Sequence, residues 1–322
     1  MRRREFILAL GGAATWSLTA RAQQPVIGFL CSGSAEAFAP LVAAFRDGLN
    51  DTGYVDGRNV TIEFAWAEGR YDKLSSMAAD LVRRDVAVIL AAGGAVAGLA
   101  AKAATSTVPI VIATGDDPVK YGLVDSLIRP TGNITGVTTF MDVLEAKRVE
   151  IVIEVTPTAI LAVLINPHNP NAEAETRAAQ EAAQQSGRKL RVLTASDERE
   201  IDAAFGALAE QAGTALTIGT DTFFYSRPGK LVGLAAQYAI PTVYFHRSFG
   251  LAGGLITYGA TLTNELRLAG QYSGRILAGE KPNSLPVLQP SKFELVVNMK
   301  TAKALNLTIP ATLLVRADEV IE

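Results

Sequence analysis

Residues 25–66, PVIGFLCSGSAEAFAPLVAAFRDGLNDTGYVDGRNVTIEFAW, contain the strand, helix and strand that decide the fold. Residues 25–31 and 59–66 are short runs rich in apolar and β-branched side chains, which are typical of strands. Residues 37–49 lie between them and have the apolar spacing of a helix. A helix that joins two successive strands is typical of a parallel sheet, so this segment predicts the first unit of an α/β fold.

The same alternation continues along most of the chain. We expect a helix at 71–84, a strand at 86–91, an Ala-rich helix at 96–104 and a strand at 109–113. The pattern then restarts, with helices at 143–155, 171–185, 198–212 and 230–238 and strands at 160–165, 190–194, 215–218, 242–245 and 255–258. No sequence repeat is evident, but the chain reads as two successive α/β units of similar size.

The C-terminal part contains a helix pattern at 264–277, a loop at 279–290 and a strand pattern at 293–298. This part is too short for a third domain. We therefore expect it to complete the first two units, so that the chain crosses between them more than once.

The first 22 residues have the pattern of an export signal. Arg2, Arg3 and Arg4 precede a short apolar stretch, and Ala20-Arg21-Ala22 is a typical cleavage site. The pair Arg3-Arg4 fits a twin-arginine signal, and an ordinary secretory signal with a basic start fits equally well. Either route predicts a mature protein that begins near Gln23 and works outside the cytoplasm.

Composition excludes several classes of partner. The signal carries four arginines and one glutamate, which leaves 26 basic and 31 acidic side chains and a net charge of about −5. No basic block remains, which argues against nucleic acid. No apolar stretch after the signal is long enough to span a bilayer. The single cysteine, Cys31, cannot form an intramolecular disulfide, and its place in a predicted strand indicates a buried thiol.

The sequence lacks the common catalytic and metal-binding motifs. The two histidines, His168 and His246, have no spacing typical of a zinc site. No G-x-S-x-G nucleophile motif occurs, and residues 93–98 do not match the dinucleotide pattern G-x-G-x-x-G. We therefore expect no metal, no cofactor and no enzymatic activity.

The loops that follow the predicted strands carry the candidate site. In open α/β sheets, ligands bind beyond the carboxyl ends of the strands. If the two units face each other, their loops line one cleft. The loops of the first unit are 32–34, 66–68, 93–95 and 114–117, and those of the second are 166–167, 220–223 and His246.

Three positions in these loops each have two interpretations. The Gly93-Gly94-Ala95 turn opens a helix, so its backbone N–H groups suit an anion such as a carboxylate, or the turn is only a tight connection. Asp221 could hold a ligand ammonium or cap the helix that follows it. Trp66 could stack on a ligand or cover the edge of the core. The sequence leaves these alternatives open.

Several stretches, in this order, resemble one protein family. They are 45–49 (FRDGL), 66–69 (WAEG), 108–111 (VPIV), 117–119 (DPV), 130–136 (PTGNITG), 257–259 (TYG) and, most specifically, 289–310 (QPSKFELVVNMKTAKALNLTIP) with 317–322 (ADEVIE). The chain resembles the exported substrate-binding proteins of ABC transporters that include the tryptophan/phenylalanine-binding type. The resemblance extends over nearly the whole mature chain.

The resemblance implies an α/β fold with two Rossmann-like lobes and parallel sheets, the type I periplasmic-binding fold, with a hinge of three crossovers. After the signal peptide, 1–22, lobe one would contain 23–140 and about 259–288, and lobe two would contain 141–258 and about 289–322. The crossings would fall near 138–142, 246–258 and 285–292. Where relatives often have a Gly-Thr/Ser-Pro turn, this chain has Gly93-Gly94-Ala95, which lacks the hydroxyl that helps to bind a carboxylate.

The resemblance also implies the site. Ser32, the Gly94-Ala95 turn and Asp117 would belong to lobe one, and Asn166, Asp221 and Tyr258 to lobe two or the hinge. With the loop residues above, the expected ligand-binding set is Ser32, Trp66, Gly94, Ala95, Thr114, Asp117, Asn166, Asp221, Phe223 and Tyr258.

These expectations lead to a functional hypothesis. The protein would be a monomer in the periplasm that delivers a small organic solute, such as an aromatic amino acid or a related carboxylate, to an ABC permease in the inner membrane. The lobes would close on the solute by a hinge motion, and no reaction would occur. The alternatives are a ligand-sensing subunit of a membrane receptor and an exported hydrolase.

Overall fold

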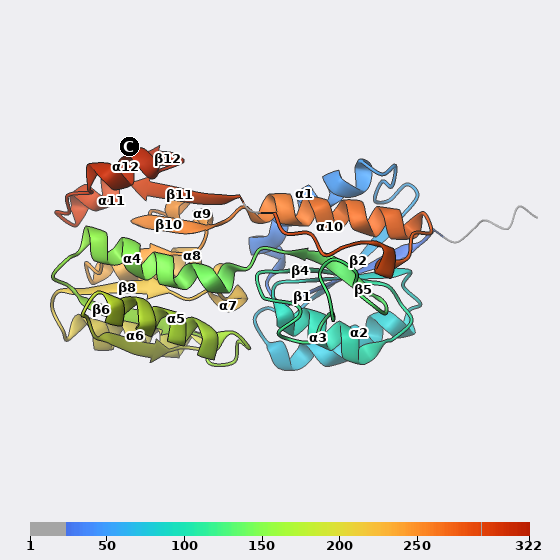
Figure 1. Cartoon of the computed structure of the whole chain (residues 1–322), viewed down its shortest axis with the longest axis horizontal. Coiled ribbons are helices and arrows are strands. Elements are labelled where there is room, and N and C mark those ends of the chain that lie inside the picture. The colour runs from blue at the N-terminus through green and yellow to red at the C-terminus, as the bar shows by residue number, and fades with distance from the viewer. Residues whose placement is uncertain (1–23, 291) are drawn as a thin grey trace, which may run out of the picture.

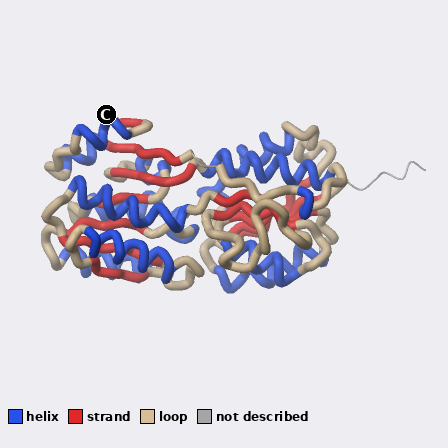
Figure 2. The backbone as a smooth tube through the Cα atoms, in the orientation of Figure 1, coloured by secondary structure: helices blue, strands red, loops and turns tan. Residues whose placement is uncertain are grey.

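The computed structural model describes residues 24–290 and 292–322, which form two α/β lobes side by side (Figure 1). The expected signal peptide, 1–22, lies outside the described residues. Within the described ranges, no helix is both long enough and apolar enough to cross a bilayer. Each lobe has its own sheet with helices packed against it (Figure 2), as the alternating sequence pattern predicted.

Lobe one is built on a sheet of five parallel strands in the order β2-β1-β3-β4-β5. The strands are β1 (Val26–Cys31), β2 (Thr61–Trp66), β3 (Val88–Ala92), β4 (Ile110–Thr114) and β5 (Ile134–Thr138). All residues of β3, β4 and β5 are buried, as is typical of a parallel sheet that has helices on both faces. Cys31 is also buried, as expected.

Four helices and two 3₁₀ turns accompany this sheet. They are α1 (Ala35–Asn50), η1 (Tyr71–Lys73), α2 (Leu74–Arg83), α3 (Ala95–Ala104), α10 (Leu262–Leu277) and η3 (Pro282–Ser284) for lobe one, with η2 (Met141–Leu144) at the passage to lobe two. Ser34 caps the N-terminus of helix α1, and its hydroxyl accepts a hydrogen bond from the Ala37 N–H. Helix α10 comes from the C-terminal third of the chain and lies along α1 (Figure 1).

Lobe two is built on a sheet of seven strands in the order β12-β11-β10-β9-β8-β6-β7. Its strands are β6 (Ile160–Ile165), β7 (Leu190–Thr194), β8 (Thr214–Ile218), β9 (Thr242–Tyr244), β10 (Ile256–Ala260), β11 (Phe293–Asn298) and β12 (Glu319–Ile321). The β10–β11 pair is antiparallel and the other pairs are parallel. Its helices are α4 (Glu145–Val155), α5 (Ala172–Gln185), α6 (Glu198–Ala209), α7 (Thr222–Tyr225), α8 (Pro228–Gln237), α9 (Arg247–Leu251), α11 (Met299–Ala304) and α12 (Ala311–Arg316).

The chain passes between the lobes in three places. The first passage joins β5 to η2 and the third leads from η3 to β11, close to the expected positions. The second passage lies at 260–262, between β10 and α10, so its expected position near 246–258 is wrong. The reason is that β9, α9 and β10 are consecutive elements of lobe two, and β10 pairs with β9 before the chain leaves.

Two strands were not anticipated from the sequence, β5 and the short β12, which pairs with β11 at the edge of lobe two. Residues 134–138 (ITGVT) form β5, which pairs with β4 at the edge of lobe one. The stretch contains Gly136 and follows the turn-rich residues 130–133, which weakened its strand pattern. Gly136 is needed there, because a Cβ atom would lie 2.1 Å from the Ile112 carbonyl oxygen.

Candidate ligand-binding site

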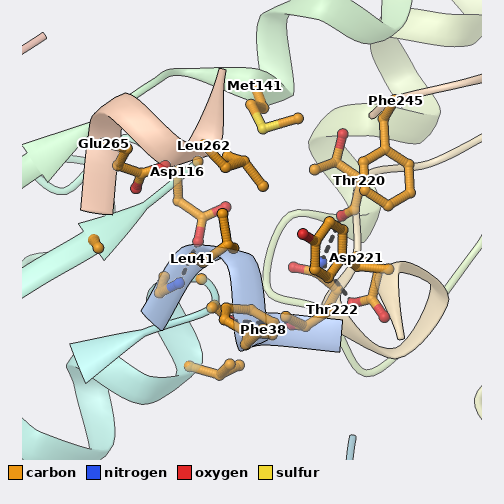
Figure 3. A pocket seen from close by; sticks show the side chains of 18 of the residues that line it. Phe38, Leu41, Asp116, Met141, Thr220, Asp221, Thr222, Phe245, Leu262 and Glu265 are labelled. Carbon is orange, nitrogen blue, oxygen red and sulfur yellow. Dashed lines mark hydrogen bonds between the residues drawn. The ribbon is translucent and has the colours of Figure 1, made fainter. Parts of the chain in front are cut away.

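A cavity lies between the lobes, at the carboxyl ends of the strands. This is where the switch in strand order between β1 and β3 places a ligand in an open α/β sheet. Lobe one and the crossing segments contribute Phe38, Leu41, Tyr71, Gly93, Gly94, Ala95, Val96, Ala113, Gly115, Asp116, Met141, Leu262, Glu265 and Leu266, and lobe two contributes Asn169, Thr220, Asp221, Thr222, Tyr225 and Phe245. Figure 3 shows how the labelled side chains surround this space.

Much of the cavity wall is apolar and aromatic. Phe38 on α1 and Tyr225 on α7 meet edge to face across the lobes, with 5.2 Å between ring centroids. Phe245, Met141 and a group of leucines extend the apolar surface. Because such a wall gains free energy by covering apolar surface of a ligand, it suits a solute with an aromatic or aliphatic body.

The polar part of the wall is acidic. Asp116, Asp221 and Glu265 line the cavity, and no lysine, arginine or histidine lines it among the residues that the structure describes. Three carboxyl groups around one small space favour a positively charged group in the ligand.

Asp116 caps helix α3 from inside the protein. Its carboxylate accepts hydrogen bonds from the Ala95 N–H, the Thr114 hydroxyl (2.9 Å) and the Asn171 side-chain amide. The first of these uses a backbone donor of the Gly93-Gly94-Ala95 turn that the sequence analysis considered for a ligand anion. The turn therefore already has an anionic partner, which is supplied by the chain itself.

Asp221 is held by four donors. Its carboxylate accepts hydrogen bonds from the Tyr71 hydroxyl (2.7 Å), the Asn166 and Asn169 amides (2.9 Å each) and the Phe223 N–H (2.8 Å). The last bond caps α7, which is the helix-cap interpretation of this residue. Burial nevertheless raises the pKa of Asp221 above its ordinary value.

Polar contacts join the lobes beside the cavity. Tyr71 of lobe one donates to Asp221 of lobe two, and the Ser32 hydroxyl lies 2.8 Å from that of Thr222. On the other side, Asp116 and Tyr121 both bond to the side chain of Asn171. The structure thus has the two lobes in direct contact around the cavity.

A buried ion pair supports the loop after β8. The Arg148 guanidinium donates to Glu145 (2.6 Å) and to the Thr220 hydroxyl (2.8 Å), and both charged side chains are fully buried. The other carboxylate oxygen of Glu145 accepts from Thr217 (2.6 Å). The pair therefore fixes the position of Thr220, which lines the cavity. We did not anticipate this pair, although its i, i+3 spacing on a helix is visible in the sequence.

The expected site residues fall into three groups. Gly94, Ala95 and Asp221 line the cavity. Three more do not line the cavity but form a hydrogen bond to a residue that does: Ser32 to Thr222, Thr114 to Asp116 and Asn166 to Asp221. The other four, Trp66, Asp117, Phe223 and Tyr258, are not among the lining residues.

These four have other contacts. Trp66 stacks on Phe64, with 5.5 Å between ring centroids, and belongs to the core of lobe one. The Asp117 carboxylate accepts a hydrogen bond from the Val119 N–H in its own turn. Its neighbour Asp116 is the aspartate of this loop that lines the cavity. The ring of Phe223 faces the Arg227 guanidinium at 4.0 Å. The Tyr258 ring packs near Phe293 in the β10–β11 pair.

The most important residue that sequence reasoning missed is Glu265. It lies on the buried face of α10 together with Leu266 and Ala269, and the half-buried Leu262 lies one turn earlier. Burial and the nearby charge of Asp116 raise the pKa of Glu265 to about 8. The sequence contains a signal for this residue. Glu265 is a charged side chain three positions after Leu262 and next to Leu266, on a helix face that is otherwise apolar.

Comparisons with known proteins agree with this architecture. The family model described as ABC transporter substrate binding protein matches residues 29–321. A curated relative, the tyrosine-binding protein of Clostridioides difficile (strain R20291), is 26% identical over 266 residues, which are 82% of this chain and 75% of the relative.

Solved structures have the same fold. A conserved domain protein from Vibrio cholerae is 26% identical, with a TM-score of 0.84 over 92% of this chain and all of the other. An ABC domain from Streptococcus pneumonia in complex with L-Trp is 24% identical, with a TM-score of 0.83 over 93% of this chain and all of the other. A ligand-free, open substrate binding protein from Clostridium difficile, also 24% identical, has a TM-score of 0.64 over 92% of this chain and 99% of the other.

The expected type I periplasmic-binding fold is confirmed by these structures and by the two sheets. The family match covers nearly all of the described residues and includes the strands and loops that surround the cavity. This chain belongs to the family of ABC transporter substrate-binding proteins.

Proposed function

We propose that this protein is the exported, periplasmic solute-binding protein of an ABC importer and that its solute has an aromatic body, with an aromatic amino acid as the first candidate. It binds and releases the solute without a reaction. It acts as a monomer and presents the closed lobes to a permease in the inner membrane.

The interlobe cavity is the observation that carries this proposal. Its wall combines aromatic and aliphatic side chains, including Phe38, Tyr225 and Phe245, with carboxyl groups that suit an ammonium. The named relatives support the aromatic part of the proposal, since one is called a tyrosine-binding protein and one holds L-Trp.

Closure of the lobes is the second part of the proposal. The hydrogen bonds from Tyr71 to Asp221 and from Asn171 to Asp116 cross between the lobes. The higher TM-score with the L-Trp complex than with the open structure supports a closed arrangement here. We infer that residues 24–140 with 262–288 move relative to residues 141–260 with 292–322. A solute that touches both lobes then favours the closed state.

Thermal denaturation with a panel of solutes tests the proposal. The protein is unfolded and refolded first, so that co-purified solute is removed. A solute that binds only the native state stabilises it by about 2.7 kcal/mol at a hundred times its Kd. We expect tryptophan, tyrosine or phenylalanine to raise the melting temperature, and sugars, nucleosides and dicarboxylates to leave it unchanged.

The same experiment separates the alternatives. If ester, amide and glycoside derivatives of the stabilising solute are recovered intact after long incubation with the protein, hydrolysis of these derivatives is excluded. Stimulation of ATP hydrolysis by a reconstituted permease would then distinguish the importer from a receptor subunit. A panel in which only sugars or nucleosides stabilise the protein would contradict the aromatic solute.

A further inference from the structure

Glu265 has a position that the fold alone does not explain. Its side chain lies in the wall of the cavity, and the residue is 2% exposed. Figure 3 shows it beside Asp116, on the side of the cavity formed by α10. Among the side chains that the structure describes, none forms a hydrogen bond or an ion pair with Glu265. A buried carboxyl group without a partner is unfavourable, so its presence in a cavity indicates a ligand group that pairs with it.

The other two carboxyl groups of the wall already have protein donors. Asp221 accepts four hydrogen bonds, and Asp116 accepts from Ala95, Thr114 and Asn171. These bonds leave Glu265 as the carboxyl group of the described wall that is available to a ligand. A metal ion is a poor candidate for its partner, because no group of three or more His, Cys, Asp or Glu side chains in the described residues could hold one.

The described wall has few groups that could bind the carboxylate of an amino acid. Among the described lining residues there is no basic side chain that could pair with a carboxylate. In the turn before helix α3, Gly94 and Ala95 have no side-chain donor, and the Ala95 N–H already donates to Asp116. An additional negative charge beside Asp116 would also be repelled.

We propose that Glu265 binds the protonated amine of the solute and that recognition requires no carboxylate, so that the cleft accepts aromatic primary amines. This inference rests on the proposed aromatic solute and specifies how that solute is recognised. The ammonium forms a charge-assisted hydrogen bond with Glu265, and the ring packs between Phe38, Tyr225 and Phe245. The chain would thus take up amines, such as decarboxylated aromatic amino acids, as well as the amino acids themselves.

Titration calorimetry on the refolded, full-length mature protein tests the inference with three matched series. Each series has an amino acid, its amine and its deaminated acid: tryptophan, tryptamine and indolepropionate; tyrosine, tyramine and hydroxyphenylpropionate; and phenylalanine, phenethylamine and phenylpropionate. In the series that binds, we expect the amine to bind at least as tightly as the amino acid, and the deaminated acid not to bind at millimolar concentration.

A pair of variants assigns the effect to Glu265. Glu265→Gln keeps the shape of the side chain but cannot ionise when the ammonium binds, so we expect amine affinity to fall at least about 30-fold. Asp47→Asn is the control, because it removes one charge from the exposed surface of α1 in the same lobe, and we expect it to change affinity less than about twofold. The comparison of ligands on the unaltered protein tests the same claim if a variant fails to fold.

The possible results distinguish the inference from the proposed function. If an amino acid binds but its amine binds more than about tenfold more weakly, the inference is wrong and the aromatic-solute function stands. Binding of the deaminated acid as tightly as the amino acid, or unchanged affinity in Glu265→Gln, would also overturn it. If no member of any series binds, the proposed aromatic solute is itself wrong, and the inference falls with it.

Discussion

The buried carboxyl group of Glu265 makes the free energy of unfolding depend on pH. The pKa of Glu265 is raised from 4.5 to about 8 by burial and by the charge of Asp116. The folded state thus favours the neutral acid, and its stability falls as pH rises from 4.5 towards 8, by at most about 1.4 kcal/mol per pH unit. Above pH 8 this penalty is complete.

Glu265→Gln removes that penalty. We expect the variant to be more stable than the unaltered protein at pH 8, by a few kcal/mol at most, and equally stable near pH 4.5. Urea denaturation at several pH values, without solute, measures the difference. Parallel stability curves for the two proteins across this range would show that Glu265 ionises normally in the folded state.

Two aromatic side chains of lobe one, Phe38 and Trp66, differ in whether they can contact a solute. Phe38 lines the cavity, whereas Trp66 stacks on Phe64 in the core. We expect Phe38→Leu to weaken binding of an aromatic solute about tenfold and Trp66→Phe to change it less than about threefold, because only Phe38 can contact the ring. Calorimetric titration of both variants checks this, and a large loss of affinity in Trp66→Phe would contradict the assignment.

Part of this site could be predicted from the sequence. Gly94, Ala95 and Asp221 follow predicted strands, and the carboxyl ends of parallel strands gather at one edge of a sheet. Glu265 and Phe38 lie on helices instead. Which helix face meets the cleft depends on how the helix docks against the sheet, and spacing along the chain does not specify that. The choice between Asp116 and Asp117 likewise depends on the turn conformation after β4.

At the scale of elements, the contact between α1 and α10 completes lobe one. A Cβ atom on Gly48 would lie 1.9 Å from the Arg267 carbonyl oxygen, and one on Gly270 would lie 2.2 Å from that of Phe45. The two helix backbones therefore approach as closely as glycine permits. Side chains cannot relieve such a clash, because the opposing atoms belong to the main chain.

We expect Gly270→Ala to lower the free energy of unfolding by about 3 kcal/mol, since the helices must move apart. The control is Gly233→Ala in α8, where a Cβ atom meets nothing within 4 Å. That change should raise stability by about 0.5–1 kcal/mol, because alanine favours helix more than glycine does. Urea denaturation measures both, and equal effects would show that the helix contact tolerates a methyl group.

Most elements followed from the period of the apolar residues, and the exceptions have physical reasons. Strand β5 contains a glycine that close approach to Ile112 requires, and this glycine weakens the strand pattern. The short helices α7 and α9 are single turns, capped by Asp221 and His246, and are too short to show a helical period. The second passage between lobes was misplaced because strand pairing, which local sequence does not reveal, keeps β10 in lobe two.

For the whole molecule, the contacts across the cleft set the balance between open and closed states. Tyr71→Phe removes the hydroxyl that donates to Asp221 at 2.7 Å. We expect the ligand-free protein to shift towards the open state, with the open-to-closed ratio rising about tenfold, because a hydrogen bond to a charged group contributes about 1.5–3 kcal/mol. Fluorescence energy transfer between dyes on the two lobes measures the ratio.

The control for this experiment is Tyr238→Phe, which removes a hydroxyl from an exposed ring at the end of α8. It should leave the transfer efficiency unchanged. If Tyr71→Phe also leaves it unchanged, the hydrogen bond between Tyr71 and Asp221 does not contribute to closure.

The late position of α10 in the chain has a consequence for biosynthesis. The face of α1 that contains Gly48 has no helix to cover it until residues 262–277 have left the ribosome, by which time every strand up to β10 has been made. The first lobe to be translated therefore gains its full helical layer only after most of lobe two has been made. Until then it exposes apolar surface, which is the kind of surface that chaperones hold during synthesis.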